Sequence, residues 1–354
     1  IIGTVVVYRQ IQYAKDRPTG YDRGGLISVP INTDELGQHL SAVSDDVLKT
    51  GVVSHIAESS QQVTGFNNNN QLDWRGKKPD QDAIFFRNVN VSADYGKTVG
   101  WKLVAGRDFS DAYGTDSSAM ILNEAAVKII GIKNVVGETM KFFGRDRVVV
   151  GVVKDMLTNS PYEQIEPALF IRDPYFYCMI IRIKPGLNMH RAVAALEPVF
   201  KKYNPSSPFI YSFPDDDYAR KFDAEERIGS LATFFAVLAI FISCLGLFGL
   251  ASFVAEQRTK EIGVRKVLGA SVLQLWRLLS GEFVRLVLIS LTIAMPLAWY
   301  LMHSWLQHYD YRTPISAWIF VASGGAALAI TLLTVSFQSV KAALANPVRS
   351  LRSE

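Results

Sequence analysis

Charged residues are distributed very unevenly along this chain of 354 residues. Up to Arg227 the longest segment without Asp, Glu, Lys or Arg has 14 residues, whereas three later segments have 28, 24 and 28: Ile228–Ala255, Leu286–Tyr309 and Thr313–Val340. About 20 helical residues cross a bilayer core of about 30 Å. Because all three segments exceed that length and are rich in aliphatic residues, they predict three transmembrane helices.

Residues 9–227 show short apolar runs separated by turn formers, which indicates a mixed α/β domain. The predicted strands are Leu26–Ile31, Ala83–Val91, Val148–Val153, Ala168–Ile171 and Cys178–Ile183. The predicted helices are Asp34–Lys49, Asn123–Ile130 and Met189–Tyr203. An exposed loop is expected at the polar run 67–70. The predicted fold class is therefore an α+β domain joined to an α-helical transmembrane domain.

The two parts differ in charge as well as in hydropathy. Residues 1–227 hold 27 basic and 28 acidic residues, and residues 228–354 hold 10 basic and 5 acidic ones. The nearly neutral first part has no sustained basic patch of the kind that binds nucleic acid. Cys178 and Cys244 fall in different parts, so no disulfide framework is expected.

Each end of the α/β part is expected to join a membrane helix. Ile1–Tyr8 is apolar but spans only about 12 Å as a helix, so it reads as the end of a truncated transmembrane helix; a short buried strand is the alternative. Residues 215–227 have no Gly or Pro and open with three aspartates, which suit a helix start. We expect them to form a stalk helix that continues unbroken into the first membrane helix.

Basic residues in the short connections predict the topology. The connection 256–285 carries six Lys and Arg residues, 310–312 carries only Arg312, and the tail 341–354 carries three more. The first connection and the tail are therefore expected in the cytoplasm and the short loop outside. The domain at 9–227 is then expected outside as well.

No residue pattern points to catalysis or to a resident metal or cofactor. The five histidines are scattered, and the two cysteines lack metal-ligand spacing. Gly96–Thr98 resembles part of a phosphate-binding loop, but the earlier glycine of that motif is replaced by Val91. Asp215–Asp217 could bind a cation, although a solvated helix start is the simpler interpretation.

The cytoplasmic connection is the most informative part of the sequence. It predicts a short helix with an apolar side, and Glu261 and Arg265 stand at i,i+4 in the favourable order. Gly269 suits the helix end, and an amphipathic stretch follows, with Arg277 placed at the membrane surface. Such a helix could dock on a cytoplasmic partner, or its basic residues could lie on lipid headgroups; composition alone leaves both open.

The run RTKEIGVRKVLGA at 258–270, after one membrane helix and before two more, resembles the FtsX-like or MacB-like permeases of ABC transporters. The tail ANPVRSLR at 345–352 resembles the end of the same domain. The runs VVGVVKD at 149–155 and GRDF at 106–109 resemble the family's extracytoplasmic domain. The resemblance therefore extends over almost the whole chain.

The resemblance implies that the chain transmits force and is not itself an enzyme. A partner ABC ATPase would carry ATP and Mg²⁺, and a second permease copy or module would complete a dimer. The expected cargo is a lipoprotein, a peptide or an amphiphile, and a periplasmic partner is possible. The ATPase-coupling residues are then Arg258, Lys260, Glu261, Ile262, Gly263, Val264, Arg265, Lys266, Val267, Leu268, Gly269 and Ala270.

The sequence supports one further interpretation of the chain's place in a longer protein and leaves one alternative function. Because the family's first helix should be complete, the chain resembles the C-terminal module of a longer bacterial permease. A membrane receptor that senses an extracytoplasmic ligand is the alternative function, and it would need a partner to signal because only residues 341–354 follow the last helix.

Overall fold

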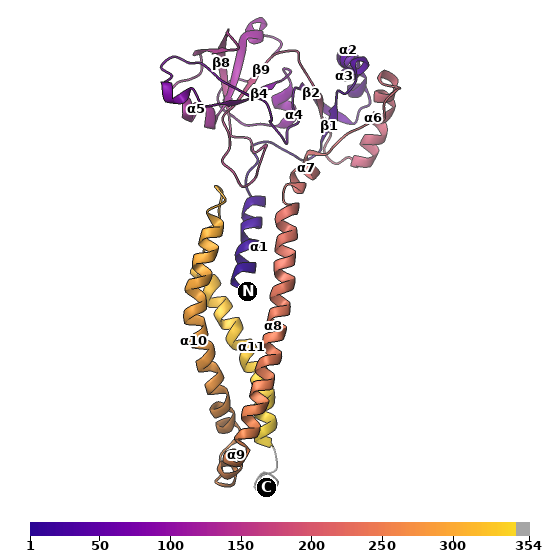
Figure 1. The fold of residues 1–354 in the computed structure, drawn as a ribbon. Helices are drawn as coiled ribbons and strands as arrows, with labels where there is room; N and C mark the ends of the chain where they lie inside the picture. Colours follow the sequence, from indigo (N-terminus) through magenta and orange to yellow (C-terminus); the bar gives the residue numbers. More distant parts are fainter. Residues whose placement is uncertain (345–354) are drawn as a thin grey trace. The chain divides into compact units, whose positions relative to one another are not determined.

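The computed structural model describes residues 1–344, with side chains up to Val340 (Figure 1). The chain divides into two compact units. One is the core domain, Asp16–Asp223. The other is the helical unit, in which Ile1–Lys15 packs with the chain from Ala224 onward.

A mixed seven-stranded sheet forms the larger part of the core domain, in the order β3-β4-β9-β6-β8-β5, with β7 also paired to β8. The pairs β4–β9 and β6–β8 are parallel, and the other pairs are antiparallel. The strands are β3 Asn69–Asn70, β4 Phe86–Asn90, β5 Leu103–Gly106, β6 Ala119–Asn123, β7 Thr139–Phe142, β8 Arg145–Val153 and β9 Ala168–Ile171.

A second, antiparallel sheet has the order β1-β10-β2. Its strands are β1 Leu26–Pro30, β2 Val53–Ser59 and β10 Cys178–Ile183. Apolar residues of α3 and α6 pack with Ile27 and Ile181 in one buried cluster on this sheet. The helices of the core domain are α2 Asp34–Gln38, α3 Leu40–Lys49, α4 Tyr95–Val99, α5 Glu124–Ile130, α6 Met189–Tyr203 and α7 Pro214–Arg220, with short 3₁₀ turns at Pro79–Gln81 and Gly114–Ser118.

An aromatic cluster lies in the main core of this domain. Trp101 packs edge-on against Phe170 with ring centroids 4.9 Å apart, and Phe66 and Tyr95 contact the same Phe170 ring. Phe66, Tyr95 and Phe170 are fully buried. Aromatic side chains remove large apolar areas from water, so this cluster stabilises the loops that carry Phe66 and Trp101 as well as the sheet.

All five predicted strands are present, and α5 and α6 fall where helices were predicted. The single helix predicted at Asp34–Lys49 is wrong in one respect, because the chain breaks at His39, which has φ −112° and ψ 17°. Part of the loop expected at 67–70 forms β3, which pairs with β4. Four strands were not predicted: β2, β5, β6 and β7. Strand β6, Ala119–Asn123, is fully buried and therefore lacks the alternation of apolar and polar residues that marks a half-exposed strand.

The helical unit contains α1 Ile2–Lys15, α8 Asp223–Gln257, α9 Thr259–Val267, α10 Val272–Leu306 and α11 Ala317–Leu344. Among the described residues, α8, α10 and Ala317–Val340 of α11 are long and apolar enough to cross a membrane. The N-terminal segment is a helix and not the alternative strand, and it runs past Tyr8 to Lys15. The amphipathic segment after the short helix is the first part of α10 and is not separate from it.

Polar and apolar contacts fix α1 against the connection between α10 and α11. The Gln10 side chain donates to Tyr311 O and accepts from Thr313 N–H, both at 2.8 Å. Tyr13 stacks on Tyr311 with ring centroids 4.6 Å apart. The connection itself runs from residue 307 to 316 and is longer than the predicted loop 310–312, because α10 ends at Leu306.

The predicted unbroken stalk is wrong. Helix α7 ends at Arg220, Lys221 and Phe222 form a turn, and α8 begins at Asp223. No Gly or Pro marks this break in the sequence. It arises from tertiary contacts, because Phe222 is buried against Tyr162 and Tyr218 and the Lys221 ammonium is held by backbone carbonyls.

Candidate functional site

The segment 258–270 contains the short helix α9, Thr259–Val267, which lies at one end of the helical unit between α8 and α10 (Figure 1). Arg258 is the N-cap residue of α9 and Leu268 its C-cap residue. The structure thus gathers all twelve residues singled out from the sequence into one compact element. The connections on both sides are short, so the position of α9 follows from the ends of α8 and α10.

The end of α9 is closed by two adjoining motifs. Gly269 adopts φ +91°, and its N–H donates to Lys266 O, while Ala270 N–H donates to Arg265 O; together these bonds form a Schellman motif. Ser271 then caps α10, since its hydroxyl accepts from Gln274 N–H and the Gln274 side chain accepts from Ser271 N–H. The turn between α9 and α10 is therefore a defined corner with its terminal backbone groups bonded.

One side of α9 packs on the membrane helices. Ile262 is 5% exposed and lies in a cluster with Leu275 and Leu279 of α10, and Val254 of α8 packs against the same cluster. Gly263 is buried as well. Burying an aliphatic side chain of this size contributes about 1.5–3 kcal/mol. The cluster therefore anchors α9 to both neighbouring helices.

Two ion pairs involve the predicted residues. Arg258 Nη2 lies 2.8 Å from Glu282 Oε1 on α10, and Arg265 Nη2 lies 2.7 Å from Glu261 Oε1 one turn earlier on α9. All four side chains remain part-exposed, so each pair contributes at most about 1 kcal/mol. The pair with Glu282 could not be read from spacing, because its partners stand 24 positions apart.

The opposite side of α9 is apolar and uncovered. Val264, Val267 and Leu268 are 49%, 66% and 80% exposed, respectively. Lys260 and Arg265 are exposed beside them. We call Val264, Val267 and Leu268 the α9 apolar patch. Contiguous exposed apolar patches with a polar rim mark sites of interaction with proteins or with membranes.

Other candidates from the sequence have structural roles. Gly96 lies in α4, where a Cβ would collide with Trp101 and Asp108, so this glycine permits close packing. Asp215–Asp217 form the first turn of α7, as a helix start requires. Within residues 1–344, no group of three or more His, Cys, Asp or Glu side chains is arranged to hold a metal ion.

Two family models match the chain. The MacB-like periplasmic core domain matches residues 1–199, and the FtsX-like permease C-terminal domain matches residues 233–347, which include α9. Since the first model covers more than half of the chain, the protein belongs to the MacB-like, FtsX-like family of ABC transporter permeases. This confirms the resemblance inferred from the motif at 258–270 and the predicted fold class.

The similar proteins are distant, and the curated relatives are longer than this chain. The macrolide export ATP-binding/permease protein MacB of Chromobacterium violaceum is 24% identical over 206 residues, which are 53% of this chain and 32% of that protein. The corresponding protein of Neisseria gonorrhoeae is 21% identical over 207 residues, with the same coverage. The periplasmic region of MacB from Actinobacillus actinomycetemcomitans is 16% identical, with a TM-score of 0.42 over 58% of this chain and 96% of that one. The matched part spans about a third of the length of the curated relatives.

Proposed function

We propose that this chain is the permease and force-transmitting subunit of an ABC transporter, and that α9 is the element that docks on the ATPase. In this proposal ATP and Mg²⁺ bind to a partner ATPase. Closure of the ATPase displaces α9, and α8 and α10 carry the displacement across the membrane to the core domain.

The α9 apolar patch is the observation that carries this proposal. Val267 and Leu268 are exposed at the last turn of a helix whose other side is anchored by Ile262 and whose end is closed by capping bonds. Because packing and capping bonds already hold α9 in place, its apolar patch can enter a groove of another protein without a further loss of conformational entropy. Because the cluster around Ile262 includes residues of both α8 and α10, a displacement of α9 acts on both helices.

Charge supports placing α9 on the cytoplasmic side. The connection 256–285 holds six Lys and Arg residues, whereas the connection between α10 and α11 holds only Arg312. Short loops rich in basic residues stay in the cytoplasm. The core domain then lies on the periplasmic side of a bacterial inner membrane, which agrees with the periplasmic core domain model that matches residues 1–199.

A lipoprotein, a peptide or another amphiphile would be extracted or exported, and the name of the matching relatives supports export as the direction. A second permease copy or module would complete a dimer. A periplasmic partner would bind the core domain.

Co-purification tests the docking role of α9. Leu268→Glu places a charge in the centre of the α9 apolar patch, and we expect loss of the ATPase from the detergent-solubilised complex and loss of its stimulation by the permease. Leu187→Glu is the matched control, since Leu187 is also exposed but lies in the core domain. Retention of a fully stimulated ATPase by Leu268→Glu would refute the docking role.

A further inference from the structure

The turn between α7 and α8 is held by a lysine that uses its whole hydrogen-bonding capacity on backbone carbonyls. Lys221 Nζ donates to Thr64 O at 2.5 Å, to Asn159 O at 2.6 Å and to Thr158 O. An ammonium group has three donors and no acceptor. Thr64 and Thr158 are buried residues and Asn159 is partly buried, so a carbonyl left without a donor here would cost free energy.

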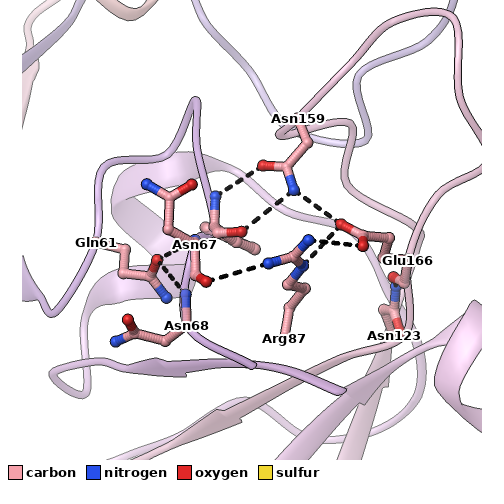
Figure 2. Close-up of polar contacts among 8 residues, drawn as sticks. Gln61, Asn67, Asn68, Arg87, Asn123, Asn159 and Glu166 are labelled. Carbon is pink, nitrogen blue, oxygen red and sulfur yellow. Dashed lines mark hydrogen bonds and ion pairs between the residues drawn. The ribbon is translucent and has the colours of Figure 1, made fainter. Parts of the chain in front are cut away.

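The carbonyls belong to two loops that are far apart in the sequence, and the Asn159 side chain joins these loops directly (Figure 2). Asn159 Oδ1 accepts from Phe66 N–H at 2.9 Å, and Asn159 Nδ2 donates to Phe66 O at 3.2 Å. The same Nδ2 donates to Glu166 Oε2 at 2.8 Å. Lys221 and Asn159 thus fasten the two loops to each other and to Glu166.

Glu166 connects the two loops to strands of the seven-stranded sheet by hydrogen bonds. Its carboxylate accepts two bonds from Arg87, from Nε and from Nη2, both at 2.7 Å. Arg87 stands in β4, opposite Ala168 of the parallel strand β9. The Glu166 carbonyl accepts from Asn123 Nδ2 at 2.9 Å, and Asn123 ends β6. Such a bidentate pair fixes the orientation of both side chains as well as their distance.

A third set of bonds holds the loop that carries Thr64 and Phe66. Gln61 Oε1 accepts from the N–H groups of Asn67 and Asn68. Gln61 Nε2 donates to Asn88 O of β4 at 2.8 Å, and Arg87 Nη1 donates to Asn67 O at 3.1 Å. Lys221, Asn159, Glu166, Arg87 and Gln61 are each bonded to at least two other residues of this network. These bonds connect both loops to β4.

We propose that Lys221 is a positioning residue that attaches the turn before α8 to this network, and through it to β4 and β9. Movement of α8 would then reach the sheet through Lys221 and Asn159, not through the backbone of α7 alone. The part of this inference that concerns force transmission rests on the function proposed above. The attachment of the turn to the two loops is independent of that function.

Hydrogen exchange of the full chain in lipid nanodiscs tests the attachment. Lys221→Met keeps the length of the side chain and removes all three donors. We expect exchange in peptides covering 61–70 and 156–162 to rise at least about tenfold, because buried carbonyls are left unpaired. Lys221→Arg keeps donors and charge and should restore most of the protection. Lys201→Met is the control, since Lys201 pairs with Glu197 on α6 and is exposed.

The pattern of exchange separates attachment from general stability. Two results together support the inference. The rise in hydrogen exchange caused by Lys221→Met is confined to these two loops, and adding Asn159→Ala to that variant raises their exchange no further. Unchanged exchange in the loops overturns it. A rise of equal size in β5 and in α6 overturns it as well, because it would show that the lysine only stabilises the domain as a whole.

The same variants test force transmission in the complex that co-purifies with the chain. When Mg²⁺-ATP and orthovanadate are added, we expect the rate of hydrogen exchange in the loop 61–70 to change in the wild type and to stay the same in Lys221→Met. No change in the wild type would refute the proposed function and leave the attachment intact. The same change in both proteins would refute the role of Lys221 in transmission alone.

Discussion

Arg258 and Glu282 connect the start of α9 to the membrane helix that follows it. The guanidinium Nη2 donates to the carboxylate Oε1 at 2.8 Å, although the two residues are 24 positions apart. Arg258 is also the N-cap residue of α9. The pair therefore fixes the beginning of α9 on α10, while the Schellman motif fixes its end.

We expect Glu282→Ala to loosen α9 without unfolding the helical unit. Both side chains are part-exposed, so the loss should be at most about 1 kcal/mol. The predicted result is faster hydrogen exchange at the first turn of α9 and about two- to fivefold weaker ATPase binding, as that free energy implies. Glu197→Ala, which removes a comparable exposed pair on α6, is the control; equal effects of the two variants would contradict the prediction.

The two sides of α9 should respond differently to truncation. Ile262→Ala leaves a cavity in the cluster with Leu275 and Leu279, and such substitutions cost about 2–5 kcal/mol. Val264→Ala removes an exposed side chain and should change the stability of α9 by no more than about 0.5 kcal/mol. Hydrogen exchange of α9 measures the first effect, and affinity for the ATPase measures the second. If Val264→Ala destabilises α9 as much as Ile262→Ala, the assignment of the two sides is wrong.

Gly269 provides a backbone test of the corner between α9 and α10. Its φ of +91° is unfavourable for residues with a Cβ, but a Cβ there would meet no atom within 4 Å. Gly269→Ala should therefore cost about 1 kcal/mol through conformation alone, and Gly269→Asn should cost less because Asn tolerates this region better. Thermal unfolding of the two variants gives the order, and an Asn variant less stable than the Ala variant would contradict it.

Lys221 should make the stability of the core domain depend on pH. Burial lowers its pKa to about 8, and the Asp217 carboxylate opposes that shift. The folded protein then loses this proton near pH 8, while the unfolded chain keeps it until about 10.5. Unfolding takes up a proton between these values, so the contribution of Lys221 to the free energy of unfolding increases as pH rises from 8 to 10.5.

Denaturant unfolding at several pH values, compared between wild type and Lys221→Met, isolates this contribution, because all other titrating groups are shared. The difference in the free energy of unfolding between the two proteins should be constant below pH 8 and should shift in favour of the wild type above it. Parallel curves up to pH 10.5 would show that Lys221 keeps an ordinary pKa in the folded protein.

The sequence predicts those features that depend on long local patterns. The membrane helices follow from segments such as Ile228–Ala255, which hold no charge over more than a bilayer thickness. The position of α9 follows from its apolar spacing and from Gly269. Strand β1 was found because Leu26–Pro30 is β-rich and bounded by turn formers.

The remaining features depend on contacts between distant residues. No Gly or Pro near Lys221 breaks the helix, and the turn there exists because the carbonyls of residues 64 and 158–159 accept hydrogen bonds from the Lys221 ammonium group. The pairing of Arg258 with Glu282 likewise requires α9 to fold back on α10. Strand β6 is buried on both faces and so lacks the periodicity that identifies a strand.

Site-specific photo-crosslinking at Leu268 tests the central claim most directly. A benzoylphenylalanine at this position, in the full chain in its native membrane, should yield a crosslinked product that mass spectrometry identifies as an ABC ATPase. The same probe at Val104, exposed on β5 of the core domain, should not. Crosslinks from Leu268 to lipid or to a second copy of this chain, with the ATPase absent, would contradict the account.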